Sequence, residues 1–133
     1  GGQLSASEKE LREFYKRLLN FTITSPALMG KFQEIQTANR DKTQGYDPGI
    51  YSYVRWSEHQ KLIIVNNFSW MTTSQFGLKV PAEVISKWKL KDGKHKLSDA
   101  LYGKKNIEME VVNGEGKVMV SVGPSESLIL SLQ

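Results

Sequence analysis

Residues 46–69 constrain the fold of this chain more than any other stretch. They contain four consecutive apolar residues, Leu62-Ile63-Ile64-Val65, with no polar position between them. A strand of this kind is covered on both faces, because a solvated face would show a polar residue at every second position. Residues 50–56 before it favour strands, and residues 57–60 form a polar connection. The two runs therefore predict an antiparallel hairpin at the centre of the core.

An amphipathic helix is predicted ahead of this hairpin, over residues 6–20. Its apolar residues recur at the spacing of one helical face: Leu11, Phe14, Tyr15, Leu18 and Leu19. Pro26 suits the first position of a short helical turn, and Gly30 suits its end. The helical period then disappears, and Phe32, Ile35 and Ala38 indicate the first strand.

The rest of the chain predicts short strands separated by turns. Val118, Val120 and Val122 alternate with polar or flexible residues, which places one face of that strand in the core. Residues 81–86 fit one helical turn, although their apolar residues also fit an extended segment, and residues 89–99 fit a lysine-rich hairpin around Asp92-Gly93. Further strands are expected at residues 75–80, 106–112, 117–122 and 127–132. Seven or eight strands after one helix indicate an antiparallel β-sandwich of Greek-key type.

Composition excludes several functional classes. The 133 residues suffice for one packed core, and no apolar run approaches the ~20 residues of a membrane helix. We therefore expect no membrane partner. The chain has no cysteine, which excludes disulfides and thiolate chemistry, but this does not indicate a cellular compartment.

No catalytic, metal or cofactor site is predicted. Glu108 and Glu110 share one strand face, about 7 Å apart by strand spacing, but a solvated face explains them better than a catalytic pair. His59 and His95 lack partners at the spacing of metal ligands. Neither a nucleophile elbow nor a glycine loop for phosphate appears.

Two surface features suggest binding. Lysines of residues 87–96 surround Trp88, but arginine is sparse there, and a lysine-rich edge strand also guards against aggregation. We therefore expect no nucleic-acid partner. Trp70 follows the buried strand in a loop, where an exposed indole could stack on a sugar ring. Trp56 and Trp88 are interpreted as core or core-edge residues.

Several segments, taken in order, resemble the junction between the catalytic barrel and the C-terminal domain of the alpha-amylase family (glycoside hydrolase family thirteen). Residues 11–19 and 25–30 are similar to the last barrel helix and the Pro-Ala-Leu turn that follows it. Residues 51–55 and 62–69 resemble paired strands that end in Asn-Phe-Ser. Residues 96–103 resemble an Asp-Leu-Leu-x-Gly segment, from which Ala100 departs, and residues 128–130 fit the closing strand.

The resemblance implies a division of the chain into two parts. Residues 1–30 would be the final barrel helix and connecting turn, and residues 31–133 the C-terminal β-sandwich domain. The family's catalytic aspartates and glutamate lie on upstream barrel strands that this sequence does not contain. The resemblance therefore carries over no catalytic residue, and we do not expect this chain to be an enzyme by itself, although its parent would be a glycoside hydrolase.

The partners implied are the upstream barrel of the same parent chain and, as a candidate ligand, an α-glucan. Leu11, Phe14 and Leu18 would form the interdomain face, and their exposure would favour self-association of the chain. The main hypothesis is an accessory domain that stabilises the barrel. The alternatives are a carbohydrate-binding module that uses Trp70 and a protein-interaction sandwich unrelated to sugars.

Overall fold

The computed structural model describes residues 6–102 and 107–133. Within the first helix it does not describe the side chains of Ser7, Leu11, Phe14, Tyr15, Leu18, Leu19, Phe21, Thr22 and Ile23. Gly103 and Asn106, which belong to predicted segments, lie outside the described residues.

One long helix leads into a β-domain. The helix, α1, spans Ala6–Thr24 and is followed by a 3₁₀ turn, η1, at Pro26–Met29. Two shorter helices, α2 at Gln36–Asn39 and α3 at Ala82–Lys87, lie between strands. The strands are β1 Lys31–Glu34, β2 Ile50–Trp56, β3 Lys61–Asn67, β4 Ser74–Val80, β5 Gly93–Asp99, β6 Ile107–Val112, β7 Glu115–Val122 and β8 Ser127–Leu132.

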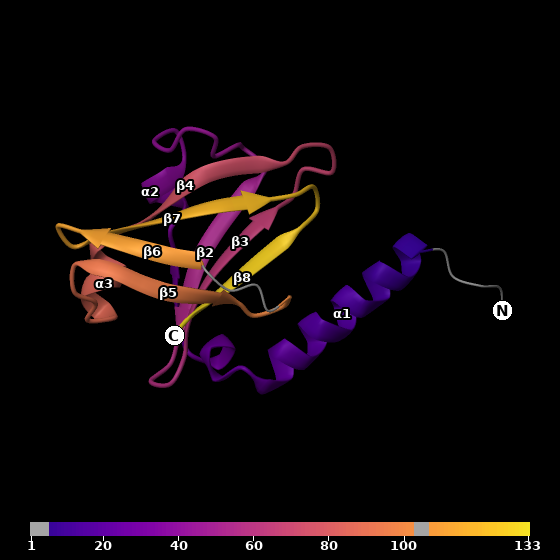
Figure 1. Cartoon of the computed structure of the whole chain (residues 1–133), viewed down its shortest axis with the longest axis horizontal. Helices are drawn as coiled ribbons and strands as arrows, with labels where there is room; N and C mark the ends of the chain where they lie inside the picture. Colours follow the sequence, from indigo (N-terminus) through magenta and orange to yellow (C-terminus); the bar gives the residue numbers. More distant parts are fainter. Residues whose placement is uncertain (1–5, 103–106) are drawn as a thin grey trace.

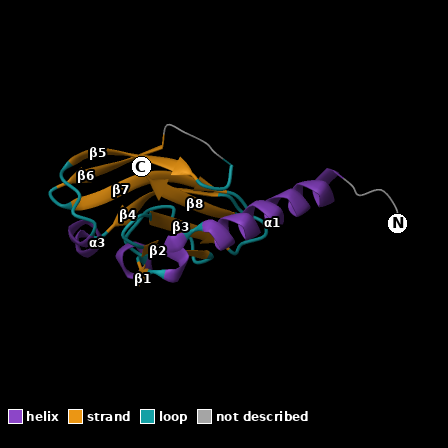
Figure 2. Cartoon of the chain, turned by 90° about the horizontal axis from the view of Figure 1, so that it is seen from below, coloured by secondary structure: helices purple, strands orange, loops and turns teal. Residues whose placement is uncertain are grey.

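The eight strands form one continuous antiparallel sheet in the order β1-β2-β3-β8-β5-β6-β7-β4. The last strand lies between β3 and β5, so segments far apart in sequence are neighbours in the sheet. The sheet curls so that β4, β5, β6 and β7 form one layer above β1, β2 and β3 (Figure 1 and Figure 2). Helix α1 projects from this domain, with its first turns farthest from the sheet.

Strand β3 is buried on both faces, as its four apolar residues predict. Ile63 and Val65 belong to the main core between the two layers, which also contains Leu78 and Val118. Leu62 and Ile64 point to the other face, into a smaller cluster of Ala27, Leu101 and Ile129. The turn η1 and the segment after β5 therefore cover the outer face of β3.

Most predicted strands are confirmed. Residues 50–56 and 61–67 pair antiparallel over their full length as β2 and β3. Along β7, the valines at positions 118, 120 and 122 are buried, while Lys117, Met119 and Ser121 are exposed. Helix α1 continues to Thr24, four residues beyond the predicted end, and the Thr24 hydroxyl donates to the carbonyl of Asn20 at 2.8 Å.

Two local predictions are wrong. Ala38 belongs to the short helix α2 and not to a strand, because the Glu34 carboxylate accepts hydrogen bonds from the backbone N–H and hydroxyl of Thr37 and turns the chain there. Residues 89–92 do not form the first arm of a hairpin. The Trp88 amide donates to Val84 and the Leu90 amide to Ile85, so this segment continues and closes α3.

Candidate functional site

Three large apolar side chains are exposed on the loop that follows β3. Phe68 is 71% exposed, Trp70 78% and Met71 70%. We call residues 68–73 the aromatic loop. The exposure of Trp70 is what its position after a buried strand predicts. Phe68 and Met71 were not singled out from sequence, although their place between polar residues just after a buried strand was an available signal.

The side chain of Asn67 holds this loop from inside. Asn67 is 2% exposed, and its Nδ2 donates to the carbonyl oxygens of Thr72 at 2.8 Å and Gly123 at 3.0 Å, with Val122 at 3.2 Å. Its Oδ1 accepts the backbone N–H of Ser69 at 3.0 Å. The asparagine of the Asn-Phe-Ser segment therefore has a structural role, joining the aromatic loop to the end of β7.

Backbone contacts fix the loop on two further sides. The Phe68 N–H donates to the carbonyl of Gly49 at 2.8 Å, and the Ser125 N–H donates to the carbonyl of Ser69 at 2.8 Å. The Ser69 hydroxyl also accepts the N–H of Thr72 at 3.2 Å. A loop held in this way presents its exposed side chains with little further ordering on binding.

The other two tryptophans lie where the sequence placed them. Trp88 is 3% exposed and belongs to the main core. Trp56 is partly buried at the core edge, and the two rings meet edge to face with centroids 6.2 Å apart and an interplanar angle of 73°. The remaining exposed face of Trp56 borders an open hollow beside η1 and the end of α3.

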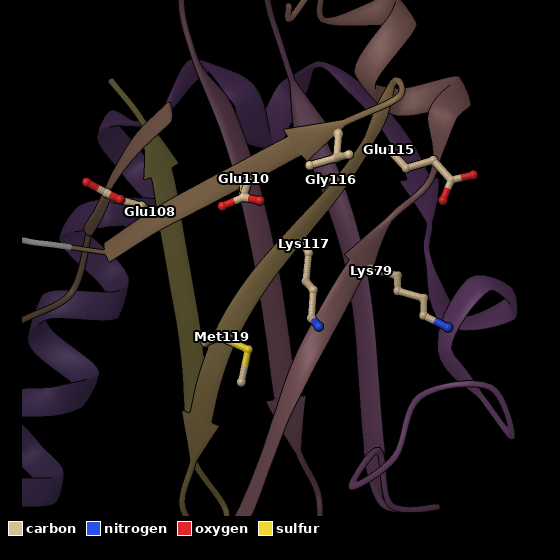
Figure 3. A pocket seen from close by; sticks show the side chains of 8 residues that line it. Lys79, Glu108, Glu110, Glu115, Gly116, Lys117 and Met119 are labelled. Atoms are coloured by element: carbon tan, nitrogen blue, oxygen red, sulfur yellow. The ribbon is translucent and has the colours of Figure 1, made fainter. Parts of the chain in front are cut away.

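A shallow hollow of about 530 Å³ lies on the outer side of β4, β7 and β6 (Figure 3). Lys79 and Lys117 are register partners on adjacent strands, and Lys117 is in turn the partner of Glu110. Gly77 leaves room for the lysine stem, since a Cβ there would lie 2.4 Å from Lys117 Cε. The lining has carboxylates and ammonium groups but no aromatic ring.

Glu108 and Glu110 both project from the outer side of β6 (Figure 3). Both are exposed, and their register partners on β5 are Lys96 and Lys94. This is the alternating charge of a solvated strand face, because opposite charges sit across from one another. The pair therefore lacks the enclosed setting of the two carboxyl groups in a glycosidase active site.

Titratable groups elsewhere are also dispersed. Within the described residues, no group of three or more His, Asp or Glu side chains could hold a metal ion. His59 is exposed in the β2–β3 turn, and His95 Nε2 lies 2.7 Å from the carbonyl oxygen of Lys91. No described helix is long and apolar enough to cross a membrane.

The predicted interdomain residues lie on α1. The backbone at Leu11, Phe14 and Leu18 is helical, as predicted, but their side chains lie outside the described part of the structure. Helix α1 contacts the β-domain through Arg17, whose guanidinium carbon lies 5.3 Å from the centroid of the Tyr102 ring.

No protein-family model and no curated protein matches this sequence. Solved structures do match the fold. AmyP in complex with maltotriose superposes with a TM-score of 0.64 at 20% identity, over 99% of this chain and 22% of that one. An alpha-amylase from Anoxybacillus superposes with a TM-score of 0.60 at 20% identity, over 93% of this chain and 22% of that one. A maltogenic alpha-amylase, AmyB, from Thermotoga neapolitana superposes with a TM-score of 0.56 at 15% identity, over 90% of this chain and 24% of that one.

The fold is thus a curled antiparallel β-domain of the class found in alpha-amylase family enzymes. The chain spans about a fifth of the length of the first two of these neighbours, at 22% each. The likeness covers nearly all of this chain and is consistent with a C-terminal domain of such an enzyme.

Proposed function

We propose that this chain is the C-terminal accessory domain of an alpha-amylase-like glycoside hydrolase that acts on α-glucans. In this proposal it has no catalytic role and stabilises the barrel that precedes it. The observation that carries the proposal is the coverage, in which 99% of this chain, including α1, aligns with only 22% of an amylase-like chain. In this proposal the catalytic residues lie in the part of the parent chain that this segment does not cover.

The stabilising contact would be made by the apolar side of α1. Leu11, Phe14 and Leu18 recur at helical spacing, and α1 projects from the β-domain (Figure 1). Burying such a face against a neighbouring domain contributes roughly 25 cal/mol per Å² of apolar surface. The contact would therefore act through its area and not through a specific bond.

The parent polypeptide tests this role. We expect removal of the segment corresponding to residues 31–133 to lower the melting temperature of the barrel by several degrees. In this proposal the catalytic residues lie outside that segment, so the truncated parent retains them. An unchanged melting temperature, or a native gene without a barrel upstream, would refute the proposal.

Self-association of the isolated chain follows from the same face. We expect sedimentation to show dimers at high concentration and Phe14→Asp to convert them to monomers, because a charge at the centre of an apolar contact is costly. Glu13→Gln is a suitable control, since Glu13 is exposed on the same helix. A chain that stays monomeric at every concentration, with stability unaffected by Phe14→Asp, would contradict an exposed apolar face.

A second candidate function is α-glucan binding at the aromatic loop. The favouring observation is that Trp70 is 78% exposed while the backbone around it is held by Asn67 and Ser69. An indole presented in this way can stack on the apolar face of a pyranose ring, and the fixed loop lowers the ordering cost of binding.

Native gels with and without soluble starch test this second function. We expect starch to retard the chain and Trp70→Ala to abolish the retardation, whereas Val112→Ala, at another exposed apolar position, should not. Retardation that survives Trp70→Ala would exclude this loop as the binding surface. Release of sugar from the starch by the purified chain would contradict its non-catalytic role.

A further inference from the structure

An asparagine or aspartate precedes a glycine at two places in the chain, Asp92-Gly93 and Asn113-Gly114. Asn113 is the only asparagine with this neighbour, since the other five precede phenylalanine, arginine, isoleucine or a second asparagine. Glycine has no side chain to hinder the approach of its backbone nitrogen to the side chain before it. The Gly114 nitrogen can therefore attack the side-chain carbonyl carbon of Asn113 with little steric hindrance.

The two pairs meet in the fold. Strand β5 begins at Gly93, which lies opposite Val111 on β6, close to the β6–β7 turn. Figure 1 shows this turn beside the start of β5, at one end of the sheet. The Asp92 carboxylate accepts the Asn113 N–H through Oδ2 and the Gly114 N–H through Oδ1, both at 3.0 Å. One carboxylate thus binds both amides at the tip of the neighbouring hairpin.

The turn itself is a two-residue hairpin loop. Asn113 and Gly114 both have positive φ, of 52° and 78°, as a type I′ turn requires, and Val112 and Glu115 pair across it. Asn113 is exposed, and nothing lies within 4 Å of a Cβ placed at Gly114. Water therefore reaches the Asn113 side chain, and the contact with Asp92 directly restrains the Gly114 nitrogen.

We propose that Asn113 is a site of spontaneous deamidation and that Asp92 sets its rate. The Gly114 nitrogen gives up its proton and bonds to the side-chain carbonyl carbon of Asn113. The bond from that carbon to the side-chain NH₂ breaks, and ammonia leaves with the proton, so that a succinimide ring remains. Water then opens the ring at either carbonyl and gives aspartate or isoaspartate at position 113. This site does not depend on the proposed role as an accessory domain.

The Asp92 carboxylate opposes the first step of this reaction in two ways. The Gly114 N–H must leave Asp92 Oδ1 before its nitrogen can attack, and a hydrogen bond to a charged acceptor is stronger than one between neutral groups. Loss of the proton also places negative charge on the nitrogen, which a carboxylate oxygen 3.0 Å away repels. A carboxylate is too weak a base to remove an amide proton efficiently. Asp92 therefore protects Asn113 while the hairpin is folded.

Ageing of the complete chain at mildly alkaline pH, followed by peptide mapping with mass spectrometry, tests this site. We expect aspartate and isoaspartate to form at position 113 before any other asparagine reacts. Asp92→Ala should accelerate the reaction roughly tenfold or more, as expected for loss of a hydrogen bond to a charged acceptor. Asp92→Asn keeps an acceptor oxygen but loses the charge, and its rate should lie between those of the parent sequence and Asp92→Ala. The chain unfolded in urea should react at least as fast as Asp92→Ala, because unfolding removes the contact.

Glu115→Gln is the matched control. It removes one negative charge from an exposed residue next to Gly114, but the described hydrogen bonds of both turn amides go to Asp92. We expect Glu115→Gln to leave the rate of deamidation nearly unchanged. Urea unfolding of each variant gives its unfolded fraction, and that fraction multiplied by the rate in urea is the share of the reaction that passes through global unfolding. Rates are compared after this share is subtracted.

Several outcomes would overturn the proposal. Earlier reaction at another asparagine, such as Asn66, would show that position 113 is not the labile site. An unchanged rate in Asp92→Ala would show that the carboxylate does not protect Asn113, and a slower rate would show that it assists the attack. Equal acceleration by Asp92→Asn and Glu115→Gln would replace the specific contact with a general effect of charge.

Discussion

The side-chain amide of Asn39 pairs with the backbone of Lys79 in the manner of a neighbouring strand. Asn39 Oδ1 accepts the Lys79 N–H at 2.8 Å, and Asn39 Nδ2 donates to the Lys79 carbonyl at 2.9 Å. The same Nδ2 donates to the Ile35 carbonyl at 2.8 Å. Lys79 lies on β4, one edge of the sheet, and Asn39 ends the helix that follows β1, the other edge. One buried side chain thus links the two edges of the curled sheet.

This relationship predicts a large cost for Asn39→Ala. The substitution leaves the N–H and the carbonyl of Lys79 without their partner, and we expect unfolding free energy to fall by about 2 kcal/mol. Urea denaturation of the purified chain measures it. Gln44→Ala, at an exposed position in the following turn, is the control and should change stability by less than about 0.5 kcal/mol. Equal effects of the two substitutions would mean that the link contributes nothing.

The aromatic loop should depend on Asn67. Asn67→Ala removes the hydrogen bonds to Thr72, Gly123 and the Ser69 amide. We expect the free energy of unfolding to fall by about 1–3 kcal/mol and the amide of Ser69 to exchange faster with solvent. The neighbouring Asn66→Ala removes the side-chain hydrogen bonds to Ser127 and Tyr53, both outside the aromatic loop, and should leave exchange in the loop unchanged. Unaltered exchange in Asn67→Ala would show that the backbone contacts alone hold the loop.

Two glycines give a matched test of close packing. A Cβ at Gly30 would lie 2.1 Å from the Trp56 backbone oxygen, so Gly30→Ala must shift either η1 or the end of β2. A Cβ at Gly77 would meet Lys117 Cε at 2.4 Å, but that atom lies near the end of a flexible side chain. We expect Gly30→Ala to lower the free energy of unfolding by about 1–3 kcal/mol, as overpacking does, and Gly77→Ala to lower it by less than Gly30→Ala does. Thermal unfolding measures both effects. A reversed order would contradict the fixed position of η1.

Stability should decline in alkali because of Tyr46. Burial raises the pKa of Tyr46, and its hydrogen bond to Ser52 opposes that shift only in part. An unfolded tyrosine ionises near pH 10, so above that pH the unfolded chain binds fewer protons than the folded one. The contribution of Tyr46 to the free energy of unfolding is therefore complete below about pH 10. It is lost as the pH rises through the pKa that Tyr46 has in the folded chain.

Tyr46→Phe separates this effect from packing. The variant should be less stable than the parent sequence at about pH 8, because it loses the bond to Ser52, yet its stability should fall less steeply between about pH 10 and pH 11. Urea titrations across that range measure both slopes. Parallel slopes for the two proteins would show that Tyr46 does not couple ionisation to folding.

The sequence predicted those parts of the fold that a local pattern encodes. The unbroken apolar run of β3 required cover on both faces, and two separate clusters provide it. The alternation of Val118, Val120 and Val122 fixed which face of β7 is buried. The position of Trp70 after a buried strand indicated its exposure, although Phe68 and Met71 beside it were not singled out. In each case the periodicity of the element itself carries the information.

Other features were decided only by tertiary structure, because they join residues that are distant in sequence. The alternation of lysines and apolar residues around Trp88 fitted a strand, yet Val84, Ile85 and Trp88 all face the core from a helical segment, where burial outweighs the local pattern. Nothing near Asn39 indicates that its amide will pair with a strand 40 positions later. The open hollow beside Trp56 forms only because η1, the β2–β3 turn and α3 meet. The sequence by itself determined the strands and their buried faces, whereas the closure of the sheet and the hollow at its end arose from contacts that only the folded chain brings together.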